Sequence, residues 1–322
     1  MQKILIMGIQ YLNSYIKQNT NEESINKINL SRLYGKVIAV DTSIYLYRFL
    51  ADETLLENMY IMISLFKSYN ITPIFIFDGK PPVEKLELLK LRNNNKITSE
   101  KQYNYIRETL KTEKSLEKCE ELYENMLILK KKFIRLKRSD FINVQELMDA
   151  YGVTYIEATG EADELCAKLV QKKIAYACLS EDMDLFLYGC PRVLRYLSLI
   201  NETVVIYYLD NILNNLKLSF KEFKEICVVS GTDYNLNNNN LYETLKYFKL
   251  YKNSNNYNIS TDFYTWLDNN TNYIDNIYKL YNIYNMFTTE NIILKKIKIK
   301  FKQEINLDKI KKIMKLEGFI FI

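Results

Sequence analysis

Short apolar runs that end beside acidic residues constrain the fold of this chain most strongly. They occur three times: residues 37–40 before Asp41, residues 74–77 before Asp78, and residues 174–179 before a Ser-Glu-Asp-Met-Asp segment that holds Asp182 and Asp184. Unbroken apolar runs of this length are typical of strands buried on both faces, as in parallel sheets. The sequence therefore predicts a parallel sheet whose strands end in carboxylates.

Alternation of strand and helix patterns extends this prediction to the whole core. Further strands are expected at residues 153–156, 193–197 and 204–208, and helices at residues 53–69 and 162–172. Such alternation is typical of a doubly wound α/β fold. Ligands of these folds bind outside the carboxyl ends of the strands, where the four acids lie. One acid there is an ordinary helix cap or turn residue, but acids after three strands predict a site.

The composition narrows the chemistry that such a site can perform. The chain has 322 residues and no histidine, which excludes histidine bases, triads and metal ligands. Its five cysteines form no C-x-x-C pair, so neither structural zinc nor a disulfide framework is expected. Hydrolysis would have to use carboxylates, lysine, arginine or a metal.

The same features bear on location. No apolar run approaches the roughly 20 residues that a membrane span needs, and the first seven residues do not form a secretory signal. We expect an intracellular protein, nuclear or cytoplasmic, that is neither secreted nor bound to a membrane.

Residues 85–140 are long, charged and helical in pattern. This stretch ends in a basic run without acids: Lys130, Lys131, Lys132, Arg135, Lys137 and Arg138. A solvated helix face is one interpretation. Binding of a polyanion beside an acidic site is the other, and the net charge of +5 agrees weakly with it.

Two helical features follow the core pattern. Ser219 and Glu222 form a capping box that predicts a helix from there to about Ser230, before Gly231. Beyond about residue 250 the chain is rich in Asn, Tyr and Lys, and we expect a helical C-terminal region packed on the core.

Six short motifs occur in the order found in one family of nucleases. They are Met7-Gly8-Ile9-Gln10, Val40-Asp41-Thr42-Ser43, Phe77-Asp78-Gly79-Lys80-Pro81-Pro82, Glu161-Ala162-Asp163, Glu181-Asp182-Met183-Asp184 and Gly231-Thr232-Asp233-Tyr234. Over residues 7–250 the chain resembles the XPG/flap endonuclease family. The resemblance implies a PIN-like α/β parallel-sheet core with helices on both faces, a helical arch and a helix–two-turn–helix element.

The resemblance also suggests a division of the chain. Residues 1–250 would form the nuclease domain, and residues 251–322 the helical C-terminal region. Within the nuclease domain, residues 1–92 would be the N-terminal region, 93–140 the arch, and 141–250 the internal region with the helix–two-turn–helix.

The activity implied is that of a 5′ flap endonuclease or 5′–3′ exonuclease that cuts DNA in replication or repair with two divalent metals. Carried over by motif, the ligands of one metal would be Asp41, Asp78, Glu161 and Asp163, and those of the other Asp182, Asp184 and Asp233. Oxygen ligands without nitrogen or sulfur suit Mg²⁺, or Mn²⁺. Lys85 and Arg92 match the basic residues at the base of the arch, which would balance phosphate charge. With Asp182, they are the expected catalytic residues.

Local geometry can be predicted for two pairs of these acids. Asp182 and Asp184 are two positions apart, so in an extended segment they would point to one face. Glu161 and Asp163 are expected in the first turn of a helix capped by Thr159, where stabilisation of the helix dipole would be the structural alternative.

The chain departs from the family pattern in several places. Asp163 stands where the family usually has Glu, and residues 235–241 are asparagine-rich where the family has a Gly-x-Gly turn that helps to bind K⁺. Six residues precede Met7, so translation could begin at Met1 or at Met7. No clamp-binding motif of the form Q-x-x-[LIM]-x-x-aromatic-aromatic occurs near the C-terminus. The expected partner of this monomer is branched or 5′-ended duplex DNA, while a non-catalytic PIN-like scaffold and a nuclease of RNA are the alternatives.

Overall fold

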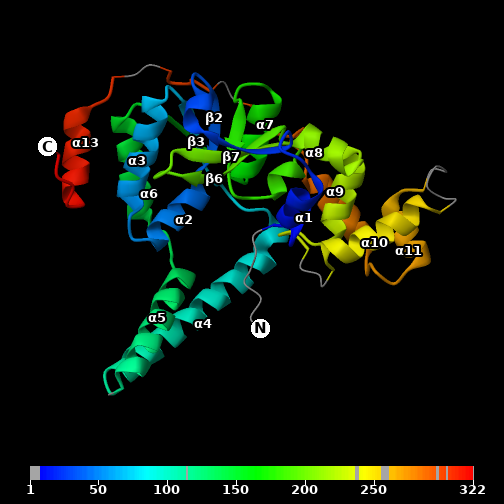
Figure 1. The fold of residues 1–322 in the computed structure, drawn as a ribbon, viewed down its shortest axis with the longest axis horizontal. Helices are drawn as coiled ribbons and strands as arrows, with labels where there is room; N and C mark the ends of the chain where they lie inside the picture. The colour runs from blue at the N-terminus through cyan, green and yellow to red at the C-terminus, as the bar shows by residue number, and fades with distance from the viewer. Residues whose placement is uncertain are drawn as a thin grey trace.

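A single seven-stranded sheet lies at the centre of the computed structural model, with helices on both of its faces (Figure 1). The structure describes residues 8–113, 115–235, 239–254, 261–294, 297–301 and 304–321. Met1 to Met7, and with them the choice of start, lie outside the described residues. The strands are β1 Ile25–Asn29, β2 Val37–Asp41, β3 Thr72–Phe77, β4 Thr154–Glu157, β5 Ala177–Leu179, β6 Arg192–Ser198 and β7 Thr203–Tyr208.

The five strands of the core are parallel, as the apolar runs predict. The order across the sheet is β1-β7-β6-β5-β2-β3-β4, and β7 and β1 extend it antiparallel beyond β6. The predicted strands are all present, although β5 starts later than expected because Ile174 and Ala175 close the turn after α7 through bonds to Leu169. β1 was not predicted, because its Ile-Asn-Lys-Ile-Asn sequence is polar, as suits an edge strand with little burial.

Alternating side chains of the central strands build two cores, one on each face of the sheet. Ala39, Ile74 and Ile76 pack toward α1 (Leu12–Asn19), α7 (Ala162–Gln171), α8 (Leu209–Leu216) and α9 (Phe220–Val229). Val40 and Phe75 pack toward α2 (Thr42–Ala51), α3 (Leu55–Ser68) and α6 (Arg138–Ala150). Burial on both faces is the physical reason for the unbroken apolar runs.

The capping box predicted for α9 is confirmed. Ser219 Oγ accepts a hydrogen bond from Glu222 N, and Ser219 N donates to the Glu222 carboxylate. The helix ends at Val229, just before Ser230.

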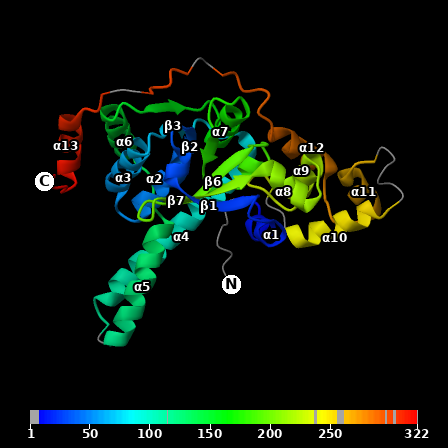
Figure 2. The same cartoon turned by 45° about the horizontal axis from the view of Figure 1, so that its top comes forward.

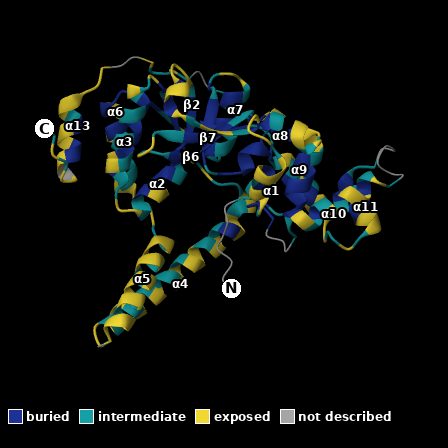
Figure 3. Ribbon diagram, viewed as in Figure 1, coloured by how far each residue is buried: buried dark blue, intermediate teal, exposed yellow. Residues whose placement is uncertain are grey.

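Two helices form a hairpin that projects from the globular body (Figure 1). The chain leaves β3 through the short helix η2 (Val83–Lys85), runs out along α4 (Leu86–Leu110) and returns along α5 (Leu116–Lys132). Figure 3 shows that most of the hairpin is exposed or half-buried. Leu88, near the base, is the one buried residue of α4. The hairpin falls mainly within residues 93–140, but α4 begins before Arg92.

The C-terminal part of the chain packs at two separate places, against α9 and against α6. Helices α10 (Leu241–Lys252), α11 (Phe263–Asn270) and α12 (Ile277–Met286) gather around α9, and the chain then crosses to α13 (Leu307–Leu316) on the far side (Figure 2). There Ile310, Ile313 and Met314 join the core between α3 and α6. Among the described residues, no helix combines the length and the apolar character needed to cross a bilayer.

Candidate active site

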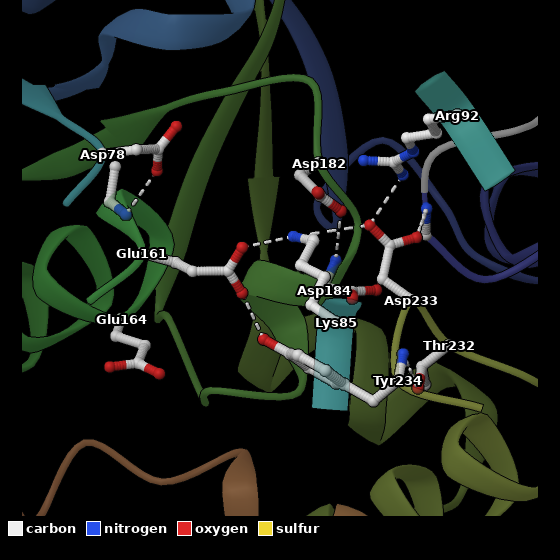
Figure 4. A network of polar contacts seen from close by, with 12 residues as sticks. Asp78, Lys85, Arg92, Glu161, Glu164, Asp182, Asp184, Thr232, Asp233 and Tyr234 are labelled. Atoms are coloured by element: carbon white, nitrogen blue, oxygen red, sulfur yellow. Dashed lines mark hydrogen bonds and ion pairs between the residues drawn. The ribbon is translucent and has the colours of Figure 1, made fainter. Parts of the chain in front are cut away.

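The acids singled out by the motifs come from separate segments and lie near the carboxyl end of the parallel strands. Figure 4 labels five of them: Asp78, Glu161, Asp182, Asp184 and Asp233. Asp41 ends β2, Asp78 follows β3, and Asp182 and Asp184 follow β5. Glu161 and Asp163 begin α7, and Asp233 follows α9. Four of them are almost fully buried: Asp41, Asp182, Asp184 and Asp233 are 4%, 7%, 5% and 7% exposed.

Burial of several carboxylates at close range disfavours their charged forms. Burial first, and the neighbouring Asp78 second, raise the pKa of Asp41 to about 8, although a hydrogen bond from Ser180 opposes the shift. Burial and neighbouring carboxylates also raise the pKa values of Asp163, Asp182 and Asp184. Positive charge beside these carboxylates would therefore stabilise their ionised forms.

Two cations from the base of the hairpin supply part of that charge. The Lys85 ammonium contacts Glu161 and lies 3.5 Å from Asp233 Oδ2, so it stands between the two acids (Figure 4). Arg92 Nη2 donates to Asp233 Oδ2 at 2.8 Å. Burial would lower the pKa of Lys85, but Glu161 and Asp233 outweigh this effect and raise it above its ordinary value. Lys85 and Arg92 thus lie beside acids of the candidate site.

Two other carboxylate oxygens of the site, Asp163 Oδ1 and Asp184 Oδ1, are buried and have no hydrogen-bond partner among the described residues, an arrangement that is costly for a polar atom. With a site built of carboxylate oxygens, these two atoms fit a divalent cation. In this conformation, no three acidic or cysteine side chains within the described ranges are gathered closely enough to hold one ion, and Lys85 lies between two of the acids.

The loop with Asp182 and Asp184 is not extended, so the prediction of an extended segment was wrong. Met183 has helical dihedral angles, and Asp184 begins the short helix η3 (Asp184–Phe186). Asp182 Oδ1 accepts from Asp184 N at 2.9 Å, the side-chain-to-backbone bond of an Asx-turn. The tight turn buries both acids together.

The start of α7 also differs from the prediction. Glu161 is the N-cap residue, Asp163 lies in the first turn as expected, and the predicted cap Thr159 takes no part. Instead Asp78 Oδ1, from the neighbouring loop, accepts from Ala162 N at 2.8 Å. Gly79 N donates to Gly160 O at 2.8 Å beside it, so the two acidic loops are locked together.

Gly8, the first described residue, lies against three acids of the site: Asp182, Asp184 and Asp233. Its N donates to Asp233 Oδ1 at 3.4 Å, and its φ of +74° favours glycine. A Cβ here would lie 2.9 Å from Asp182 Oδ1 and 3.1 Å from Asp184 Oδ1. Only glycine lets the N-terminal segment approach the acids this closely.

Sequence reasoning missed two residues that organise the acidic loop. Ser180 Oγ donates to Asp41 Oδ2 at 2.8 Å and accepts from Asp182 N at 3.1 Å. Arg195, only 6% exposed, donates to Glu181 O and to Asn13 Oδ1, each at 2.8 Å. The available signal was a lone arginine in the apolar run of β6.

The predicted DNA-binding run lies at the end of α5 and the start of α6. Lys130 pairs with Glu53, Lys131 with Asp52 at 2.7 Å, and Arg135 with Glu100 at 2.8 Å. Lys132 is exposed at the end of α5, Lys137 is the N-cap residue of α6, and Arg138 is its first residue. Lys130, Lys131 and Arg135 therefore neutralise the protein's own acids in this conformation.

Comparison with known proteins identifies the family. The XPG N-terminal domain model matches residues 7–99 and the XPG I-region model matches residues 152–233, together more than half of the chain. Flap endonuclease 1 of Methanococcus aeolicus is 29% identical over 246 residues, which cover 71% of this chain and 70% of the relative. That of Debaryomyces hansenii is 30% identical over 251 residues, 71% of this chain and 62% of the relative.

Solved structures share the fold. The catalytic core of Rad2 in complex with DNA substrate has a TM-score of 0.68 at 19% identity, with 97% of this chain and 96% of that chain covered. Flap endonuclease-1 from Methanococcus jannaschii has a TM-score of 0.61 at 23% identity, with 96% and 93% covered. At these identities the likeness shows the PIN-like α/β fold. The domain matches and the flap endonuclease relatives show that the chain belongs to the XPG/flap endonuclease family.

Proposed function

We propose that the chain is a structure-specific 5′ nuclease, a flap endonuclease with 5′–3′ exonuclease activity, that hydrolyses DNA phosphodiesters in replication or repair. One observation carries the proposal: two acids of the matched I-region, Glu161 and Asp233, pair with two cations of the matched N-terminal domain, Lys85 and Arg92, at the base of a projecting helical hairpin. Its substrate would be branched or 5′-ended duplex DNA, bound by a monomer inside the cell, in the nucleus or cytoplasm. Since the chain spans 62% of the Debaryomyces relative, the activity of the whole relative enters here as a proposal.

The acids divide into two groups that would each hold one Mg²⁺, or Mn²⁺. Asp41, Asp78, Glu161 and Asp163 form one group, and Asp182, Asp184 and Asp233 the other. Divalent ions at such a site activate water and stabilise the negative charge that develops on phosphate. Each group holds one buried oxygen without a hydrogen-bond partner in the described part of the chain, on Asp163 or on Asp184, which supports an ion in each group.

Lys85 and Arg92 would balance the charge of the scissile phosphate. Both lie in η2 or α4, next to the acids, and both already contact Asp233. An arginine can bind two phosphate oxygens at once, and a lysine acts as a point charge. When a phosphate enters, these side chains would exchange carboxylate partners for phosphoryl oxygens.

Substitution of Asp182 tests the catalytic assignment. Asp182 is buried and central in the site, and its Oδ1 holds η3 by a bond to Asp184 N. Asp182→Ala should lose nearly all cleavage of a 5′-flap duplex with Mg²⁺. Cleavage at the wild-type rate would remove Asp182 from the mechanism. Asp182→Asn keeps the shape of the side chain and an oxygen that can accept from Asp184 N, so it separates the loss of charge from a loss of folding.

The hairpin of α4 and α5 would guide a single-stranded 5′ end past Lys85 and Arg92. This follows from its place between β3 and α6, with the two cations at its base. A bulky group attached to the 5′ end of the flap should slow cutting, while the same group on the 3′ end of the other strand should not. Equal rates would argue against threading.

Parallel assays of DNA and RNA flaps, with and without Mg²⁺, test the substrate class. Metal-dependent cutting of DNA supports the proposal. Cutting of RNA alone would indicate an RNA nuclease, and binding without cutting would indicate a scaffold.

Two further contacts with duplex DNA are proposed. One is the basic run from Lys130 to Arg138. The other is a K⁺ ion at the asparagine-rich turn, although residues 236–238 lie outside the described residues. Asn235 Oδ1 accepts from Thr232 N at 2.7 Å, and Asn239 Nδ2 donates to Val229 O at 3.3 Å, so asparagine side chains brace the ends of this turn. Exchange of K⁺ for Na⁺ in a duplex-binding assay tests the ion.

A further inference from the structure

A buried tyrosine hydroxyl holds one of the acids of the candidate active site. Tyr234, 7% exposed, donates from its hydroxyl to Glu161 Oε2. The other oxygen, Glu161 Oε1, accepts from Lys85. Figure 4 shows the phenol and the carboxylate pointing at each other. Glu161 is therefore held at both oxygens, by a cation on one side and a neutral donor on the other.

The hydroxyl of a second tyrosine, Tyr188, lies between that of Tyr234 and another acid of α7, Glu164. The hydroxyl of Tyr188 lies 3.2 Å from that of Tyr234 and 3.5 Å from Glu164 Oε1. Tyr188 is 4% exposed. Glu161 and Glu164 stand at the N-cap and in the first turn of α7, so the tyrosine pair faces both acids at the start of this helix.

An aromatic residue from the C-terminal part of the chain packs against both tyrosines. Phe287, at the end of α12 and 2% exposed, has its ring 5.1 Å from that of Tyr188 and 5.2 Å from that of Tyr234. Both contacts are edge-to-face, at 61° and 66°, an arrangement that aromatic pairs favour. Phe287 lies beyond both matched domains, the later of which ends at residue 233.

The segment with Phe287 is itself fixed on two sides. Lys224 Nζ of α9 donates to Phe287 O at 2.6 Å. Thr289 Oγ1 donates to Gln171 Oε1 at 2.5 Å, and Gln171 Nε2 donates to Tyr188 O at 2.7 Å. Residues 287–289 thus join α9, α7 and Tyr188, so that the two phenol rings have little freedom to turn.

We propose that Tyr234 is a positioning residue of the nuclease site, which fixes Glu161 in one orientation, and that Phe287 preserves this contact by holding the rings of Tyr188 and Tyr234. A glutamate side chain has three rotatable bonds, and a second hydrogen bond restricts them. For this reason, residues that hydrogen-bond to metal-binding carboxylates have large effects on metal affinity and on activity. The inference rests on the proposed function, since Glu161 is taken there as a ligand.

Removal of the hydroxyl alone tests the positioning role. Tyr234→Phe in the full chain should lower kcat on a 5′-flap duplex about tenfold, with KM changed less than twofold and the unfolding temperature retained. Tyr264→Phe is the matched control, because it deletes a buried hydroxyl that donates to Glu225 O at 3.2 Å, away from the acids. It should leave kcat unchanged. A wild-type kcat in Tyr234→Phe would overturn the proposal.

A double-mutant cycle separates positioning from a general loss of packing. If Tyr234 acts through Glu161, Tyr234→Phe should have no further effect on kcat in a Glu161→Gln background. Additive losses would show that it acts elsewhere. Phe287→Leu should lower kcat in the same direction as Tyr234→Phe. A lower unfolding temperature with an unchanged kcat would refute the part assigned to Phe287.

Titration with Mn²⁺ in the absence of DNA gives a readout that needs no substrate. By calorimetry, Tyr234→Phe should bind Mn²⁺ several-fold more weakly than the wild type, and Tyr264→Phe should bind like the wild type. Equal binding by Tyr234→Phe would refute the positioning role. Absence of flap cutting by the wild type would instead refute the proposed function, so the two failures are distinct.

Discussion

Arg92 Nη2 lies 2.8 Å from Asp233 Oδ2, so a helix that leaves the globular body is tied to an acid at the end of α9. Lys85 reaches the same oxygen at 3.5 Å. The base of the hairpin and the acidic site are therefore one electrostatic unit. A substitution at the base of the hairpin should therefore alter the electrostatics of the acidic site, and the reverse.

Arg92→Ala should reduce kcat about 100-fold, because a charge aimed at the phosphate is lost. Arg92→Lys should recover only part of this loss, since lysine cannot bind two oxygens in a fork. Single-turnover rates on a 5′-flap duplex measure both variants. A rate for Arg92→Lys below that of Arg92→Ala would contradict this account.

Gly8→Ala should abolish most activity. A Cβ would meet Asp182 Oδ1 at 2.9 Å, and the backbone would be strained at φ +74°. Gly35→Ala is the control, because Gly35 has a similar φ of +70° but no atom within 4 Å of the added carbon. Both variants should lose about 1 kcal/mol of stability to backbone strain. Similar kcat values for the two would show that the contact with Asp182 is unimportant.

Lys130 and Lys131 have two competing partners, the acids Glu53 and Asp52 or the phosphates of DNA. If they bind DNA, Lys130→Ala/Lys131→Ala should weaken binding and reduce the slope of log affinity against log salt by about 2. The matched variant Asp52→Asn/Glu53→Gln frees the lysines and should bind DNA at least as well as the wild type. Weaker binding by the second variant would indicate that the ion pairs hold the hairpin in place.

Asp184→Asn should stabilise the metal-free protein while it destroys activity. Asp184 is 5% exposed, and no described residue donates a hydrogen bond to its Oδ1, so its charge is costly to bury. Thermal unfolding in EDTA should show a higher midpoint for the variant, by a few degrees. Addition of Mg²⁺ should raise the midpoint of the wild type more than that of the variant. A lower midpoint in EDTA would contradict the prediction.

Glu225 should make stability depend on pH. Burial raises its pKa to about 7, with Lys221 opposing and Asp262 and Glu222 reinforcing the shift. Because the folded state binds the proton more tightly than the unfolded state, the contribution to stability is present below about pH 4.5 and is lost as the pH rises toward 7. Glu225→Gln should remove this loss and raise the free energy of unfolding at pH 8, by up to about 3 kcal/mol. Urea unfolding at pH 5 and pH 8 measures it, and equal gains at both values would exclude this cause.

The central strands were predictable because their burial on both faces leaves a continuous apolar signal. The acids could be located because each follows such a strand or belongs to a motif. The cap of α7 could not be predicted, since Asp78 reaches it from a loop that is 84 positions earlier in the chain. For the same reason, neither the contact of Phe287 with Tyr234 nor the anchoring of Glu181 by Arg195 has a local pattern. The strand β1 was missed because an edge strand carries few apolar residues.

The hydrogen bond from Gly8 to Asp233 joins residues that are 225 positions apart. A ribosome delivers Gly8 first and Asp233 much later, at about 5–20 residues per second. During this interval the new chain holds Asp41 and Asp78 but lacks the partners that complete their site. A growing polypeptide would therefore carry no cutting activity until Asp233 had been synthesised, which would keep shorter nascent chains harmless to nearby nucleic acid.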